Sequence, residues 1–214
     1  MDLPRFSRAA VVFMIAVPIA WAVVLLFHPA PEDPYYESLK DDATAMIVVH
    51  ALTLPFIGLI GAALYLLVRD LPGTAARVSL FAIPVFVLFY GAGEATLGVA
   101  TGVVVDHANG FPPDEQALAG EGAQAIWDGF VTATLFPGIG GIAWVVAAVA
   151  AALACRRAGA PLAVTVLLAL SGFVALHGPP IGPIALLCFA TAVFLLFRQQ
   201  GAADTLAAPA PAEP

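Results

Sequence analysis

Six apolar segments, separated by more polar loops, limit what this chain can fold into. A helix of about 20 apolar residues crosses the ~30 Å hydrocarbon core of a lipid bilayer. The sequence is 61% hydrophobic and 11% charged, whereas an average soluble domain is about 25% charged. We therefore predict an all-α integral membrane protein that folds as a six-helix transmembrane bundle. The six segments are residues 9–27, 43–68, 78–105, 123–154, 162–176 and 181–197.

The sequence also indicates how the two ends of the chain are organised. The first apolar segment is longer than the apolar region of a usual signal peptide and lacks a good small-residue cleavage site, which indicates a retained helix. The last two segments are short and are joined by "HGPPIGP", whose prolines and glycines predict a tight turn. We expect one transmembrane domain over residues 1–198 and a disordered, Ala- and Pro-rich cytoplasmic tail over residues 199–214.

The distribution of positive charge predicts the orientation in the membrane. Six helices place seven of the eight cationic residues on one side and Lys40 on the other. Because cytoplasmic loops are rich in Lys and Arg, both termini are expected in the cytoplasm, in a multi-pass protein of the cell (inner) membrane. The seven residues are Arg5, Arg8, Arg69, Arg77, Arg156, Arg157 and Arg198.

The loops on the opposite side are acidic, and the net charge of the chain is −7. This charge, together with the lack of a basic stripe, argues against nucleic acid as a partner. The acidic surface either is simply solvated or forms a funnel that attracts cations. Cys155 and Cys188 form neither a CxxC motif nor a disulfide framework.

Glu94 is an ionisable residue in the middle of an apolar segment. With the outer boundary near Val105 and a rise of about 1.5 Å per residue, Glu94 lies roughly 16 Å deep, near the membrane midplane. A charged side chain there costs about 2.5–3.5 kcal/mol, so the acid is protonated or faces partners inside the bundle. Because the apolar segments lack Lys and Arg in their interiors, we expect a protonated or metal-paired acid.

Polar residues on four segments are predicted to form an outward-facing pocket with Glu94 at its floor. We assign catalytic roles to Glu94, Asp128 and His50. Gln124, Asp128 and Thr132 follow an i, i+4, i+8 spacing, which places them on one face of a continuous helix. The predicted pocket-lining residues are Tyr90, Thr53, Thr132, Gln124 and Ser171.

The histidines are candidate metal ligands. His28, His50, His107 and His177 all fall toward the outer side of the predicted helices. Histidines with nearby carboxylates can bind zinc, copper or iron. No HxxxH or HExxH spacing places two ligands on one helical face, so His28, His107 and His177 are weak candidates. A haem ligated by His50 and a second histidine fits poorly, because the other histidines lie nearer the surface. The cofactor is left open.

Three stretches carry a resemblance to known proteins. They are "LPFIGLIGAALYLLVRDLPG", "FYGAGEATLGVATGVV" and "IWDGF". Together they resemble small multi-spanning membrane proteins of actinobacterial type, and the likeness covers most of the chain. The resemblance implies a membrane bundle and brings no activity, cofactor or site residue with it.

Three classes of function are compatible with these observations. The first is a membrane-embedded enzyme in which Glu94 donates a proton to an apolar substrate that enters from the bilayer. The second is a proton- or cation-coupled transporter or channel subunit, since intramembrane acids are common on ion pathways and several helices contain proline. The third is a non-catalytic subunit that binds another membrane protein through small-residue faces such as Gly98 and Gly102.

Overall fold

The computed structural model describes residues 5–207, with side chains described as far as residue 200, and all the regular secondary structure of this part of the chain is helical. The first half contains α1 (Arg8–Leu25), α2 (Tyr35–Leu39), α3 (Ala43–Val68), α4 (Thr74–Gly93), the π-helix η1 (Glu94–Ala100) and α5 (Thr101–Ala108). The second half contains α6 (Pro113–Trp127), the π-helix η2 (Phe130–Leu135), α7 (Phe136–Arg157), α8 (Leu162–Leu170), the 3₁₀-helix η3 (Ser171–Ala175) and α9 (Ile181–Ala207).

Within the described residues, five helices are long and apolar enough to cross a membrane, which indicates a membrane protein. They are Arg8–Leu25, Ala43–Val68, Thr74–Ala108, Phe130–Arg157 and Ile181–Gln200. The sixth predicted segment forms the shorter apolar helix Leu162–Ala175. With nine α-helical and five 3₁₀ residues it is roughly 23 Å long, less than a hydrocarbon core of about 30 Å.

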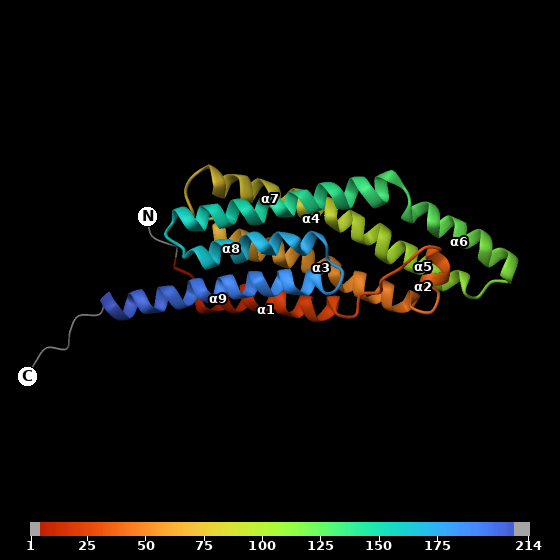
Figure 1. Cartoon of the computed structure of the whole chain (residues 1–214), viewed down its shortest axis with the longest axis horizontal. Coiled ribbons are helices and arrows are strands. Elements are labelled where there is room, and N and C mark those ends of the chain that lie inside the picture. Colours follow the sequence, from red (N-terminus) through yellow and green to blue (C-terminus); the bar gives the residue numbers. More distant parts are fainter. Residues whose placement is uncertain (1–4, 208–214) are drawn as a thin grey trace, which may run out of the picture.

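The helices run up and down along one axis (Figure 1). The contacts between α4 and α7 and between α1 and α9 are the most extensive ones. The start of α1 and the end of α9 lie at one end of the bundle, which we call the proximal end (Figure 1). α2, α5 and α6 project beyond the opposite, distal end, and these three helices form what we call the cap.

Two separate apolar clusters stabilise the bundle and the cap. The bundle core packs fully buried aromatic side chains, among them Trp21, Phe86 and Trp144, against aliphatic residues. The cap has its own smaller cluster, in which Tyr35 stacks on Trp127 with ring centroids 4.6 Å apart. Between these two clusters α1 and η3 end and α9 begins, while α3 and the continuous helix of α4, η1 and α5 pass through.

The third apolar segment is longer than one membrane crossing, and this changes the predicted depth of Glu94. α4, η1 and α5 run continuously over 35 residues, roughly 52 Å at the rise of an α-helix. The 20 residues of α4 alone span about 30 Å before Glu94 is reached. Glu94 therefore lies near the distal end of the bundle rather than at its midplane, because the part beyond it belongs to the cap.

Two other boundaries differ from the expected ones. The predicted helix over residues 123–154 is interrupted, since α6 ends at Trp127 and Gly129 adopts an extended conformation (φ −61°, ψ 127°) before η2 begins. The predicted disordered tail starts as helix, because α9 continues to Ala207. Residues 208–214 of that predicted tail lie outside the described residues.

Candidate metal centre

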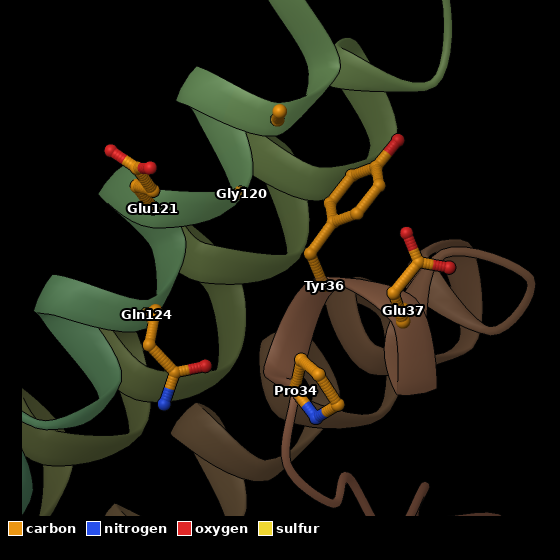
Figure 2. A pocket seen from close by; sticks show the side chains of 7 residues that line it. Pro34, Tyr36, Glu37, Gly120, Glu121 and Gln124 are labelled. Atoms are coloured by element: carbon orange, nitrogen blue, oxygen red, sulfur yellow. The ribbon is translucent and has the colours of Figure 1, made fainter. Parts of the chain in front are cut away.

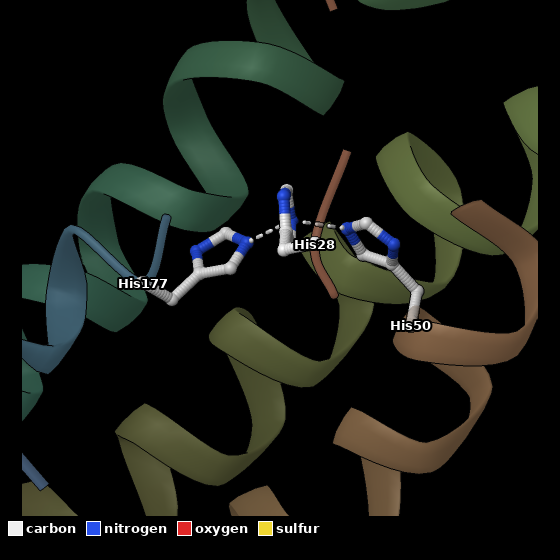
Figure 3. Close-up of side chains that lie close together, drawn as sticks. All are labelled: His28, His50 and His177. Carbon is white, nitrogen blue, oxygen red and sulfur yellow. Dashed lines mark hydrogen bonds between the residues drawn. The ribbon is translucent and has the colours of Figure 1, made fainter. Parts of the chain in front are cut away.

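Three histidines from distant parts of the sequence meet at the distal end of the bundle (Figure 3). His28 follows the end of α1, His50 lies on α3, and His177 lies in the turn between η3 and α9. The Nε2 atom of His28 is 3.2 Å from Nε2 of His50 and 2.9 Å from Nε2 of His177. One ring nitrogen from each histidine lies within 4.8 Å of the other two.

The Nδ1 atoms of two histidines show which ring nitrogen carries the hydrogen. Nδ1 of His50 is 2.8 Å from the carbonyl oxygen of Met46, and Nδ1 of His28 contacts the carbonyl oxygen of Pro29. A carbonyl oxygen can only accept, so each Nδ1 must be the donor. In a neutral ring the Nε2 atom is then unprotonated. The Nε2 lone pairs of His28 and His50 consequently face each other at 3.2 Å with no hydrogen between them.

A tyrosine orients the third histidine. Nδ1 of His177 is 2.7 Å from the hydroxyl oxygen of Tyr90, a residue of α4 that is buried against α7. The same hydroxyl lies 3.4 Å from the carbonyl oxygens of Val174 and Ala175, to which it can donate its hydrogen. When the hydroxyl donates to these carbonyls it accepts a hydrogen bond from Nδ1 of His177, and in that tautomer the Nε2 atom of His177 is also unprotonated.

This arrangement suits a transition-metal ion. In a tetrahedral zinc site with Zn–N bonds of about 2.0–2.1 Å, neighbouring ligand nitrogens are about 3.3 Å apart. The separations of 2.9 and 3.2 Å are close to that value. Each ligand would also have the outer hydrogen bond from its other ring nitrogen that metal-binding histidines almost always make. Burial, followed by the neighbouring His177, lowers the pKa of His28 below its usual range, which favours a neutral imidazole.

Glu94 lies beside the three rings as the first residue of η1. Its Oε2 is 3.5 Å from Nε2 of His50, and its Oε1 is 3.5 Å from Nδ1 of His177. The side chain is only 5% exposed, and Oε2 has no hydrogen-bond partner among the residues that the structure describes. A buried acceptor without a partner costs about 1–3 kcal/mol, so a cation or a bound donor at this position would stabilise the fold.

Two glycines make room for the histidines. A Cβ atom on Gly98, one turn beyond Glu94, would overlap the ring of His50. A Cβ atom on Gly182 would overlap the backbone of His177. Any larger residue at either position would displace a histidine or the helix that carries it. π-helical turns such as η1 are frequent at functional sites, and this one brings Glu94 and Gly98 to the same face of the centre.

Only part of the predicted pocket meets at this position. Glu94, His50 and Tyr90 lie together with His28 and His177. Thr53 and Ser171 lie deeper, inside the bundle. The hydroxyl of Thr53 accepts a hydrogen bond from Trp21, and the hydroxyl of Ser171 donates to the carbonyl of Leu168.

The remaining predicted residues belong to the cap or its junction. Nε2 of Gln124 donates to Asp128 at 2.9 Å and to Asp33 at 3.2 Å. The hydroxyl of Thr132 donates to the carbonyl of Gly129 at 3.1 Å. The expected common face of Gln124, Asp128 and Thr132 is absent from the described structure, because the helix breaks at Gly129. His107 packs on Phe111, with ring centroids 5.0 Å apart, away from the three converging histidines.

A hollow lies in the cap, between α2 and α6 (Figure 2). Its lining includes Tyr36, Glu37, Glu121 and Gln124. Glu37 pairs with Lys40 at 2.7 Å, and Tyr36 donates its hydroxyl hydrogen to Asn109. These side chains are satisfied by their neighbours or by solvent, and the hollow is separate from the histidine centre.

The convergence of His28 and His177 on His50 was not predicted from the sequence. The three ligands lie on three separate segments, so no short motif can report them. Only the predicted topology pointed to it, because it places each of the three histidines at or near the outer end of its helix. Comparisons of the chain with protein-family models, with curated proteins and with solved structures found no match.

Proposed function

We propose that this chain is a membrane metalloprotein in which His28, His50 and His177 hold one divalent transition-metal ion. The convergence of three Nε2 atoms carries the proposal, because those of His28 and His50 are both unprotonated and lone pairs repel unless a cation lies between them. Imidazole ligands suit zinc, copper, iron and nickel. Glu94 supplies negative charge beside the ion and completes the set of polar groups.

Among the three classes of function, an enzyme or another resident metal protein receives the most support. Below the centre, the bundle is filled by the fully buried side chains of Trp21, Phe86 and Trp144. In the described part of the bundle, the other buried polar side chains, such as Ser79, have hydrogen bonds within the core. This packing favours a metal that stays in place over a metal or proton that crosses the bundle. Glu94 keeps its proposed role as the group that accepts and donates protons.

We also propose that the chain crosses the cell membrane six times with both termini in the cytoplasm. The cation distribution supports this topology. The up-and-down course of the helices, with α1 starting and α9 ending at the proximal end, supports it as well (Figure 1). The short helix of α8 and η3 would then leave the membrane at His177, and the metal centre would lie at the outer boundary of the hydrocarbon core.

Metal analysis of the purified protein tests the proposal. Detergent-solubilised protein is prepared without chelators, incubated in turn with Zn²⁺, Cu²⁺, Fe²⁺ and Ni²⁺, desalted, and measured for metal content. We expect one ion per chain in the wild type and at least a 100-fold loss of affinity in His50→Ala. His107→Ala is the matched control, because His107 lies in the cap, and it should bind metal as the wild type does. A wild type that binds none of the four ions overturns the proposal, as does an equal loss in both variants.

A further inference from the structure

The proposed metal centre has fewer protein ligands than a closed site requires. Among the described residues, the group whose ligand atoms converge within 4.8 Å contains only the three histidines. Glu94 is not part of this group, although its Oε2 lies 3.5 Å from Nε2 of His50 and its Oε1 lies 3.5 Å from Nδ1 of His177. Structural zinc sites have four protein ligands, whereas catalytic sites have three and bind water at the fourth position.

We infer that the centre keeps an open coordination position beside Glu94, and that a water molecule bound there hydrolyses esters of membrane-borne amphiphiles. This inference rests on the proposed metal site. Oε2 of Glu94 is buried, has no hydrogen-bond partner among the described residues, and lies 3.5 Å from Nε2 of His50. A water bound to the ion would supply the donor that this oxygen lacks. Glu94 then serves as the general base.

The proton and bond changes balance with water as the only co-reactant. One O–H bond of the bound water breaks, and its proton moves to Oε2 of Glu94. The remaining hydroxide oxygen forms a bond to the carbonyl carbon of the ester. The bond from this carbon to the alkoxy oxygen then breaks, and Glu94 returns the proton to the departing alcohol. The products are a carboxylic acid and an alcohol.

The position of the centre points to an amphiphilic substrate. His28 lies three residues beyond the end of α1, and His177 lies four residues before the start of α9. The centre is thus at the level where apolar helices end, which is where the ester groups of membrane lipids meet the polar boundary. His177 is 22% exposed, whereas Glu94 is 5% exposed, so access is from the histidine side.

Exposed apolar residues adjoin two of the histidines in the sequence. Phe27 and Leu26 precede His28, and Leu176 precedes His177, and all three are largely exposed. A rim of this kind can hold the hydrocarbon part of an amphiphile while its ester reaches the ion. A small water-soluble ester would lack these contacts.

Two measurements on metal-loaded protein test the inference. First, azide is added to the Co²⁺-loaded wild type, and the visible spectrum is recorded. An open position predicts a saturable spectral change. Second, hydrolysis of 4-nitrophenyl palmitate and 4-nitrophenyl butyrate in phosphatidylcholine vesicles is measured with the Zn²⁺-loaded wild type and Glu94→Gln. We expect a higher kcat/KM for palmitate, a loss of at least 100-fold in Glu94→Gln, and metal affinity within about threefold of the wild type. Glu121→Gln, in the cap, is the control and should hydrolyse both esters normally.

The outcomes separate this inference from the metal site itself. If no metal binds, both proposals are wrong. If metal binds but azide leaves the spectrum unchanged, the site is closed and the inference alone is wrong. A metal affinity that falls more than tenfold in Glu94→Gln makes Glu94 a ligand and overturns its role as base. Equal rates for the two esters, or no metal-dependent hydrolysis, overturn the substrate class.

Discussion

The histidine centre and the polar network of the cap contain similar chemical groups, but they differ in how those groups are satisfied. In the cap, Gln124 bridges Asp33 and Asp128, while Asn109 accepts from Tyr36 and donates to the carbonyl of Lys40. Every one of these contacts pairs a donor with an acceptor. In the centre, the unprotonated Nε2 atoms of His28 and His50 face each other.

This difference separates a structural network from a candidate binding site. Buried polar groups in folded proteins nearly always have partners, so a cluster of buried acceptors without donors indicates a missing cation or donor. The cap network is at least partly exposed and would lose little on substitution, whereas in the centre His50 and Glu94 are buried and His28 and His177 are half-buried. If the comparison is correct, variants in the centre should weaken metal binding and leave the cap stable. Variants in the cap should loosen the cap and leave metal binding unchanged.

The largest expected effect is the response of thermal stability to metal. A ligand that binds only the folded state stabilises it by about 4 kcal/mol at a concentration 1,000 times its Kd. The wild type should therefore unfold at a clearly higher temperature with Zn²⁺ than with a chelator, measured by fluorescence in detergent. His177→Ala should lose this shift, while Asp128→Asn should keep it. A shift of equal size in all three proteins would show that the metal binds elsewhere.

Substitution of Gly98, the glycine beside His50, should change metal binding by nearly as much. In Gly98→Ala the added methyl group overlaps the ring of His50, so either this ring or η1 must move. Overpacking of this kind costs about 1–3 kcal/mol, and a displaced ligand should lower metal affinity at least 100-fold. Affinity is measured by competition with a chromogenic chelator.

Gly91→Ala, about two turns earlier in the same continuous helix, is the matched control. A Cβ atom at Gly91 meets none of the described atoms within 4 Å, so metal affinity should be unchanged. Unchanged affinity in Gly98→Ala would show that His50 is not held in the position seen in the structure.

The sequence predicted the bundle and its buried acid better than it predicted the ligands. Apolar segments and an isolated acid such as Glu94 can be recognised from the sequence alone, because hydrophobicity and charge are properties of single residues. The partners of His50 depend on where α1 and η3 end relative to α3, which no local pattern records. Asp128 was assigned to the pocket on helical spacing, and it does lie beside Gln124. The common face does not continue to Thr132, because the chain is extended at Gly129.

A smaller effect is expected from the outer hydrogen bond of His177. Tyr90→Phe removes the hydroxyl that holds Nδ1 of His177 at 2.7 Å and leaves the aromatic packing in place. Loss of such an outer partner typically costs 10–100-fold in metal affinity, so we expect a decrease in that range. The Co²⁺ spectrum should also change, because the ring is free to rotate. In a His177→Ala background the same substitution should have no further effect on affinity.

Tyr36→Phe provides the corresponding test in the cap. This variant also removes a tyrosine hydroxyl and its hydrogen bond, here to Asn109 at 2.9 Å. It should leave metal affinity and the Co²⁺ spectrum as they are in the wild type. If Tyr36→Phe weakens metal binding as much as Tyr90→Phe does, general loosening of the distal end, and not ring orientation, is the cause.

The smallest expected effect is confined to the cap itself. Gln124→Ala removes hydrogen bonds to Asp33, to Asp128 and to the backbone of Tyr35, most of them partly exposed. Since each such bond contributes about 0.5–1.5 kcal/mol or less, the cap should open more readily while the bundle core is unaffected. Hydrogen exchange should therefore rise in α2 and α6 and stay constant in α3 near His50, with metal bound throughout. Faster exchange around His50 would show that the cap holds the centre together, and the two regions could no longer be treated as independent.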